Sequence, residues 1–235
     1  MSNLGKVPLE RALSKLGVAS RTQTNELISK GQISVEGKVI RDPKFLVTPE
    51  TARITVNGKL VVKSIWQTIM LNKPKGYVTT RSDEKGRQTV YDLLPEGLKH
   101  LHSVGRLDMA TTGLLILTTD TKLSNFLTDP VNEFLRTYIV VVEGNVTVED
   151  VVKLQAGIED EGEMLKPKEV TLRKRSNKES HLTIKLTEGK NREVRRLMAA
   201  IGREVTELKR VSFGKLMLGQ LLPGQYKTIN KEDVL

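Results

Sequence analysis

The 235-residue sequence contains no cysteine. This absence excludes disulfide bonds, thiolate nucleophiles and cysteine-ligated metals, and it is typical of a protein that works in the cytoplasm. Histidine is also scarce: His100, His102 and His181 form no close cluster with acidic residues, so we expect no zinc or iron site. The sequence shows no signal peptide and no apolar run of membrane-spanning length, so we expect no association with a membrane.

Acidic residues are too few to balance the basic ones. The chain has 38 Lys+Arg against 28 Asp+Glu, a formal net charge of +10, which favours a polyanionic partner such as a nucleic acid. Several catalytic motifs are also absent: GxxxxGK[ST], GxGxxG, HExxH and GxSxG. We therefore expect no nucleotide cofactor and none of the hydrolase chemistries that those motifs carry. Hydrophobic residues make up 38%, enough for a buried core.

The first 62 residues read as a separate basic unit. The stretch "VPLERALSKLGVASRTQTNELISKGQISVEGKVI" predicts two short helices and a hairpin, and "ITVNGKLVV" predicts a second hairpin at Asn57-Gly58. Ten basic residues face five acidic ones up to Val62, a net charge of +5. This excess is typical either of a solvated surface or of a phosphate-binding face for structured RNA. The candidate RNA contacts are Arg11, Lys15, Arg21, Lys30 and Lys38.

The remainder reads as one mixed domain. We expect strands at Val170–Leu172, at His181–Leu186 and in "RTYIVVVEG", and a strand, a turn and a second short strand in "TIMLNKPKGYVTT". Thr147 with Asp150 marks the start of one helix, and "NREVRRLMAAIG" is the clearest helix because its apolar residues recur at helical spacing. Many strands joined by short turns favour an α+β domain with a mainly antiparallel sheet over alternating βαβ units.

Two stretches hold the candidate site. In "GRLDMATTGLLILTTD", Arg106 and Asp108 precede a buried apolar run, where an aspartate either caps a turn or does chemistry. Tyr138 lies in an apolar strand and is either a core residue or a site residue. The stretch "EGKNREVRR" supplies cations on a solvated or RNA-facing surface: Lys190, Arg192, Arg195 and Arg196.

The N-terminal segment resembles the S4 RNA-binding domain through "LGVASR" and the "I..G.I.VEGK" ending. S4 domains accompany several different enzymes, so this resemblance implies RNA without naming a reaction. We expect an S4-like domain at 1–62, a linker at 63–67 and a catalytic domain at 68–235.

The later domain resembles the pseudouridine synthases, in the RsuA-like branch. The resemblance rests on "GRLDMATTGLLILTTD", "LNKPKGYVTT", "RTYIVVVEG", "EGKNREVRRLMAAIG" and "LKRVSFGKLMLGQLLPGQYKTI", in that order. Gly105 stands where the sister branch has histidine, which favours the RsuA-like branch.

This resemblance implies that a uridine in ribosomal RNA is isomerised to pseudouridine without a cofactor. Asp108 matches the catalytic carboxylate, Arg195 its ion-pair partner and Tyr138 the tyrosine that stacks on the uracil. We expect Arg106 to fill the space left by the flipped base and Arg192 to support the site. We expect Thr111, Thr112 and Gly113 to form a close turn beside Asp108.

Several alternatives stay open. "GKNREVRR" is more similar to enzymes acting on large-subunit (23S) rRNA, with small-subunit (16S) rRNA as the alternative target. A non-enzymatic S4-type ribosome-assembly factor that binds RNA, and a nucleoside hydrolase that releases uracil, are the competing functions. Asp108 attacks C1′, attacks C6 of the uracil, or drives elimination to a glycal-like sugar. We expect a monomer that meets rRNA, free or in an assembly intermediate.

Overall fold

The computed structural model describes the backbone of residues 5–16, 18–19, 21–49, 51–61 and 67–234. The side chains of Lys15 and Arg21, two predicted RNA contacts, fall outside this description, and so does the predicted linker apart from Gln67. The chain forms two compact units. The first contains the described residues up to Gln67 with the short segments 97–102 and 119–121, and the second contains the rest.

The first unit packs two helices against short strands. The helices are α1 (Leu9–Lys15) and α2 (Arg21–Ser29), and the strands are β1 (Val7–Pro8), β2 (Ile33–Val35), β3 (Lys38–Val39), β4 (Leu46–Val47), β5 (Ile54–Val56) and β6 (Lys59–Leu60). β1 pairs with β4, and the other four form a sheet in the order β3-β2-β5-β6. Buried apolar residues form its core, among them Leu9, Leu13, Ile28 and Ile33.

Both predicted hairpins of this unit are confirmed. Glu36 and Gly37 join β2 to β3, and Asn57 and Gly58 join β5 to β6. All four residues have positive φ, between 50° and 79°, which a two-residue turn of this hand requires.

The second unit is built on a nine-stranded sheet among the described residues. Its strands are β7 (Thr68–Lys73), β8 (His102–Val104), β9 (Thr112–Thr118), β10 (Arg136–Glu143), β13 (Glu169–Arg175), β14 (Glu179–Leu186), β15 (Val205–Phe213), β16 (Leu216–Met217) and β17 (Tyr226–Thr228). The main path runs β13-β14-β10-β15-β9-β7-β17. Within this path only β9 and β15 are parallel, so the predicted α+β class with a mainly antiparallel sheet is confirmed.

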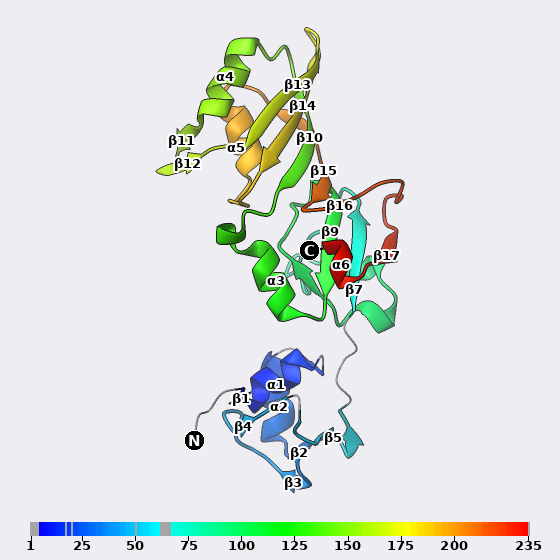
Figure 1. Ribbon diagram of the computed structural model, residues 1–235. Helices are drawn as coiled ribbons and strands as arrows, with labels where there is room; N and C mark the ends of the chain where they lie inside the picture. Colours follow the sequence, from blue (N-terminus) through cyan, green and yellow to red (C-terminus); the bar gives the residue numbers. More distant parts are fainter. Residues whose placement is uncertain (1–4, 17, 20, 50, 62–66, 235) are drawn as a thin grey trace. The chain divides into compact units, whose positions relative to one another are not determined.

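Helices and one hairpin flank this sheet. They are α3 (Thr121–Thr128), α4 (Val148–Ala156), α5 (Glu193–Ala200) and α6 (Lys231–Val234), the short 3-10 turns η1 (Val90–Leu93), η2 (Glu96–Leu98) and η3 (Pro130–Asn132), and the hairpin β11 (Ile158–Asp160) with β12 (Glu163–Leu165). Within the second unit, α4 and α5 lie beside the β13-β14-β10 part of the sheet, and α3 and α6 lie beside β9 and β7 (Figure 1). No helix among the described residues is long and apolar enough to cross a membrane.

The period-2 pattern of β10 separates the two faces of the sheet. Tyr138, Val140 and Val142 are buried, whereas Ile139 between them is 44% exposed. Tyr138 lies opposite Ile184 of β14 and Arg210 of β15, so these side chains share a face. Ile184 belongs to the alternating buried residues of β14, so this is the covered face of the sheet. Tyr138 and Arg210 therefore project from the covered face of the sheet.

Most predicted elements of this unit are confirmed, including the helix that starts at the Thr147 and Asp150 capping box. One strand is wrong: the segment after the turn of "TIMLNKPKGYVTT" forms only an isolated bridge between Val78 and Thr89. The β11–β12 hairpin was not predicted.

Candidate active site

Asp108 lies in the connection between β8 and β9, where a buried lysine fixes the backbone. Lys73, the last residue of β7, is fully buried. Its Nζ donates to the carbonyl oxygens of Thr111 at 2.8 Å, Pro74 at 3.1 Å and Met109 at 3.4 Å. The Thr111 N–H donates to the Asp108 carbonyl at 3.0 Å and closes the turn. Hydrogen bonds from Lys73 thus hold the backbone that carries the Asp108 side chain in place.

Lys73 was missed by the sequence analysis. Burial lowers its pKa to about 8, while the negative charge of Asp108 acts in the opposite direction. A buried ammonium is costly unless its donors are hydrogen-bonded, and the three carbonyl acceptors meet that need. The available signal was a lysine shortly after the apolar run "IML" and directly before Pro74.

Gly113 brings the Asp108 connection against β15. It was expected in a close turn, but it lies inside β9 and pairs with Arg210 of the parallel strand β15. Its φ is +103°, and a Cβ atom there would lie 2.2 Å from the Arg210 carbonyl oxygen. The expectation of a turn is therefore corrected for Thr112 and Gly113: the glycine allows close strand contact.

A cavity of about 470 Å³ opens beside Asp108. Three parts of the second unit form most of its lining: the connection before β9, the covered face of β10 and β15, and the segment from Glu188 to Val194 at the start of α5. Thr128 and Pro130 also line it. Asp108 and Tyr138, both predicted site residues, lie in this one cavity, although thirty residues of chain separate them. Tyr138 is 8% exposed, so little of its ring is open to solvent.

The ion pair of Asp108 is formed by Arg192. Arg192 Nη1 lies 3.6 Å from Asp108 Oδ2, and the two side chains are 54% and 41% exposed. The family resemblance predicted this contact for Arg195. The Arg195 Nη1 instead donates to the Val205 carbonyl at 3.0 Å. Arg195 is still close enough for the Asp108 charge to raise its pKa, against a larger lowering by burial.

The backbone explains this correction. Arg192 precedes α5 in a left-handed conformation, with φ 48° and ψ 29°. It therefore departs from the helical spacing that would place it on the outer side with Arg195. Arg195 lines a neighbouring recess together with Arg192 and Arg203.

Arg196 and Lys190 were predicted to contact RNA. In the structure both bind residues of the β11–β12 hairpin. Arg196 pairs with Asp160 and, at 2.6 Å, with Glu163, and its own side chain is 16% exposed. These carboxylates raise its pKa. Lys190 Nζ donates to the Met164 carbonyl at 2.7 Å and pairs with a neighbouring glutamate. Both residues hold the hairpin, and their contact with RNA stays a prediction.

Arg106 lies between two recesses. It is exposed and lines both the cavity of Tyr138 and a second recess of about 440 Å³, which Asp108 also lines. Lys85 and Arg87 line the second recess as well. Cations thus line both of the recesses that Asp108 lines.

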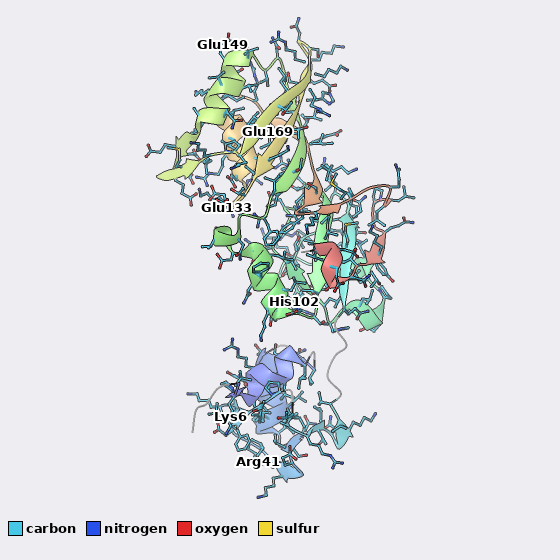
Figure 2. All side chains as sticks on the ribbon, viewed as in Figure 1. Lys6, Arg41, His102, Glu133, Glu149 and Glu169 are labelled. Carbon is cyan, nitrogen blue, oxygen red and sulfur yellow. The ribbon has the colours of Figure 1, made fainter. Side chains whose placement is uncertain are left out.

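The first unit displays the predicted basic residues that the structure describes. Arg11 and Lys38 are exposed, and Lys30 is exposed but pairs with Glu26 at 2.7 Å. Lys6 and Arg41 add further exposed positive charge to this unit (Figure 2). Among the described residues of the whole chain, no three His, Asp or Glu side chains gather as a metal site.

Comparison with known families gives two matches along the chain. The RNA pseudouridylate synthase family matches residues 67–200, and the S4 domain matches residues 7–52. The chain is 36% identical over 231 residues to an uncharacterised RNA pseudouridine synthase of Aquifex aeolicus, covering 97% of this chain and 92% of the relative. It is 36% identical over 228 residues to ribosomal large subunit pseudouridine synthase B of Bacillus subtilis, covering 96% and 93%.

A solved structure agrees with these relatives. A crystal structure of a pseudouridylate synthase superposes with a TM-score of 0.68 and 27% identity, covering 97% of this chain and 98% of the other. The similarity therefore extends over both units of the chain.

Proposed function

Since this chain belongs to the RNA pseudouridylate synthase family, we propose that it isomerises a uridine of large-subunit rRNA with Asp108 as the catalytic carboxylate. The observation that carries the role of Asp108 is its place with Tyr138 in one cavity, held by Arg192. Large-subunit rRNA is supported by the name of the Bacillus subtilis relative and by the "GKNREVRR" stretch.

The reaction needs an anion beside the sugar and a surface that retains the base. The bond from ribose C1′ to uracil N1 breaks, C5 then bonds to C1′, and the proton that C5 loses is balanced by one that N1 gains. Attack on C1′, attack on C6 and elimination at the sugar all begin with an ionised carboxylate. The Arg192 guanidinium, 3.6 Å from Asp108 Oδ2, places a positive charge beside this carboxylate.

Tyr138 keeps the detached uracil in place. Stacking on an aromatic ring contributes about 1–3 kcal/mol per base, whichever way the ring is turned. The buried position of Tyr138 on β10 fixes the ring plane, so the uracil rotates against a constant surface. The Tyr138 hydroxyl then assists the transfer of the C5 proton.

The target nucleotide must leave its stack to reach the cavity. Arg106, exposed at the edge of both recesses, fills the vacated space or holds a flanking phosphate. The basic first unit, through Arg11, Lys30 and Lys38, adds sequence-independent affinity for phosphates. Arg195 supports the charge balance around Asp108, since the two groups interact electrostatically.

The test is chemical mapping of pseudouridine in 23S and 16S rRNA from cells with and without the gene, repeated with purified protein and transcripts. One 23S position that loses modification with the gene and regains it with the protein supports the proposal. A position in 16S rRNA would contradict the large-subunit assignment. Release of free uracil from the transcripts would contradict isomerisation.

A further inference from the structure

The cavity beside Asp108 holds two buried polar atoms that the described residues leave without a hydrogen bond. Glu193 and Arg210 line the cavity, and each is 3% exposed. Glu193 Oε1 and Arg210 Nη2 have no partner within the described part of the chain. Buried polar groups are nearly always paired, so two exceptions in one cavity point to a partner that arrives with the substrate.

Each side chain is anchored through another of its atoms. Glu193 Oε2 accepts from the Lys190 backbone N–H at 3.2 Å. Arg210 Nε donates to the Leu114 carbonyl at 2.7 Å, and its guanidinium lies over the Phe213 ring, 5.3 Å from the centroid. One unpaired acceptor and one unpaired donor are thus held by fixed side chains.

Both residues are coupled by the backbone to the proposed catalytic groups. Glu193 directly follows Arg192, the ion-pair partner of Asp108. Arg210 lies opposite Tyr138 in the β10–β15 pairing and shares its sheet face. Glu193 and Arg210 therefore line the same cavity as Asp108 and Tyr138.

We propose that Glu193 and Arg210 select uracil over cytosine: Glu193 Oε1 accepts the N3–H of the base, and Arg210 Nη2 donates to a uracil carbonyl oxygen. This inference rests on the proposed function in one respect, that the cavity receives the target base. Uracil presents a donor at N3 between two carbonyl acceptors. Cytosine presents an acceptor at N3 and an amino donor beside it. The acceptor Glu193 Oε1 would then face the acceptor N3, and the donor Arg210 Nη2 would face the amino group, so both contacts would be unfavourable.

The substitution Glu193→Gln inverts one of these contacts with little change in shape. The Lys190 N–H can be satisfied only by the oxygen of the new amide, so the amide NH₂ takes the place of Oε1. An acceptor thereby becomes a donor, which faces N3–H of uracil unfavourably and N3 of cytosine favourably. Glu188→Gln is the matched control, because it removes a neighbouring carboxylate that is paired with Lys190.

The experiment is a ligand-observed NMR titration of the full-length protein with free uracil, cytosine and 3-methyluracil at pH 8.5, above the raised Glu193 pKa of about 7, so that both Glu193 oxygens are acceptors. We expect wild type and Glu188→Gln to bind uracil about tenfold or more tightly than cytosine, as one good base contact provides. Glu193→Gln should abolish or reverse that preference. Wild type should also bind 3-methyluracil, which lacks N3–H, about tenfold more weakly than uracil.

Two outcomes would overturn the inference. One is the same uracil-to-cytosine ratio in wild type and Glu193→Gln, including an equal loss for both bases, because a purely structural role or a bridging water predicts it. The other is equal binding of uracil and 3-methyluracil, or no binding of uracil, by wild type, a result that needs no variant to fold. Neither measurement uses rRNA or turnover. A different rRNA target would therefore contradict the proposed function without affecting the result of this binding test.

Discussion

Arg192 Nη1 lies 3.6 Å from Asp108 Oδ2, and this contact joins the β8–β9 connection to the residue that precedes α5. Both side chains are about half exposed, so water and salt weaken the pair and it adds only about 0–1 kcal/mol to stability. We therefore expect the pair to act mainly on the reaction. Bound substrate excludes water from the site, and the electrostatic interaction of the guanidinium with nearby charges is then stronger.

Arg192→Ala should reduce single-turnover pseudouridine formation by about 10²-fold or more, the range seen when one electrostatic group is removed. The thermal unfolding midpoint should change little. Arg196→Ala is the matched control, because it removes an arginine four residues away that ties the β11–β12 hairpin to α5. It should lower the unfolding midpoint and retain more activity. The account is contradicted if Arg192→Ala keeps the wild-type rate at saturating RNA.

Lys73→Met should impair catalysis through the backbone of the Asp108 turn. The variant removes the donor to three carbonyl oxygens, and the loss of a buried charge offsets part of the resulting instability. We expect a change in unfolding free energy within about 2 kcal/mol, RNA affinity close to wild type and a rate reduced about tenfold or more. Filter binding and single-turnover assays separate these effects. A lower affinity with an unchanged rate would show that Lys73 binds RNA and has no part in shaping the turn.

Gly113→Ala should destabilise the second unit strongly, because the new Cβ would lie 2.2 Å from the Arg210 carbonyl oxygen of the paired strand. Gly76→Ala is the control: its φ of +95° is similar, but no atom lies within 4 Å of the added Cβ. We expect about 1 kcal/mol for the control, the cost of the positive φ alone, and at least about 3 kcal/mol for Gly113→Ala. Urea unfolding measures both, and equal losses would refute the close approach of β9 and β15.

Glu193 should make the stability of the protein depend on pH. Burial, and then the charge of Glu188, raise its pKa from 4.5 to about 7, while Lys190 and Arg136 act in the opposite direction. The raised pKa means that the neutral form favours the fold. The contribution of neutral Glu193 to the unfolding free energy is complete below pH 4.5. It is lost as the pH rises to about 7, which lowers the unfolding free energy by up to about 3 kcal/mol.

Glu193→Gln should remove this pH-dependent component, since the amide does not ionise. The difference in unfolding free energy between the variant and wild type should therefore shift in favour of the variant from pH 4.5 to pH 7. Glu188→Gln should keep this pH-dependent component and narrow it, because the charge of Glu188 is one cause of the raised pKa of Glu193. Parallel stability curves for wild type and Glu193→Gln would show that Glu193 ionises as readily in the folded state as in the unfolded chain.

The elements with strong local signals were predictable from the sequence. The apolar run of β10, the capping box of α4 and the helical period of α5 all appear within one or two residues of the expected positions. The β11–β12 hairpin was not, because "IEDEGEML" is charged, largely exposed and without clean alternation. It is held from outside by Arg196 and Lys190, and contacts of that kind leave no periodic pattern in their own segment.

The candidate site was predictable as a set of residues and less so as a set of contacts. Asp108 and Tyr138 were expected together, and they line one cavity. The family resemblance assigned the ion pair with Asp108 to Arg195, whereas the structure has it at Arg192. The left-handed backbone of Arg192 before α5 leaves no pattern in the sequence that would show this. The position of Lys73 at the end of a buried strand was visible in the sequence, but its role depends on three carbonyl groups after β7 and near Asp108, which the local pattern does not show.

Asp108→Asn tests the central claim most directly, because the substitution keeps the shape of the side chain and removes the charge that each version of the mechanism requires. Pseudouridine formation on an rRNA transcript that wild type modifies should be followed across pH 6 to 9, with RNA binding measured in parallel. We predict no detectable product at any pH, because an amide has nothing to ionise, with RNA affinity retained or slightly increased by the loss of a negative charge near phosphate. Substantial turnover by Asp108→Asn anywhere in that range would contradict the account and remove Asp108 from the catalytic role.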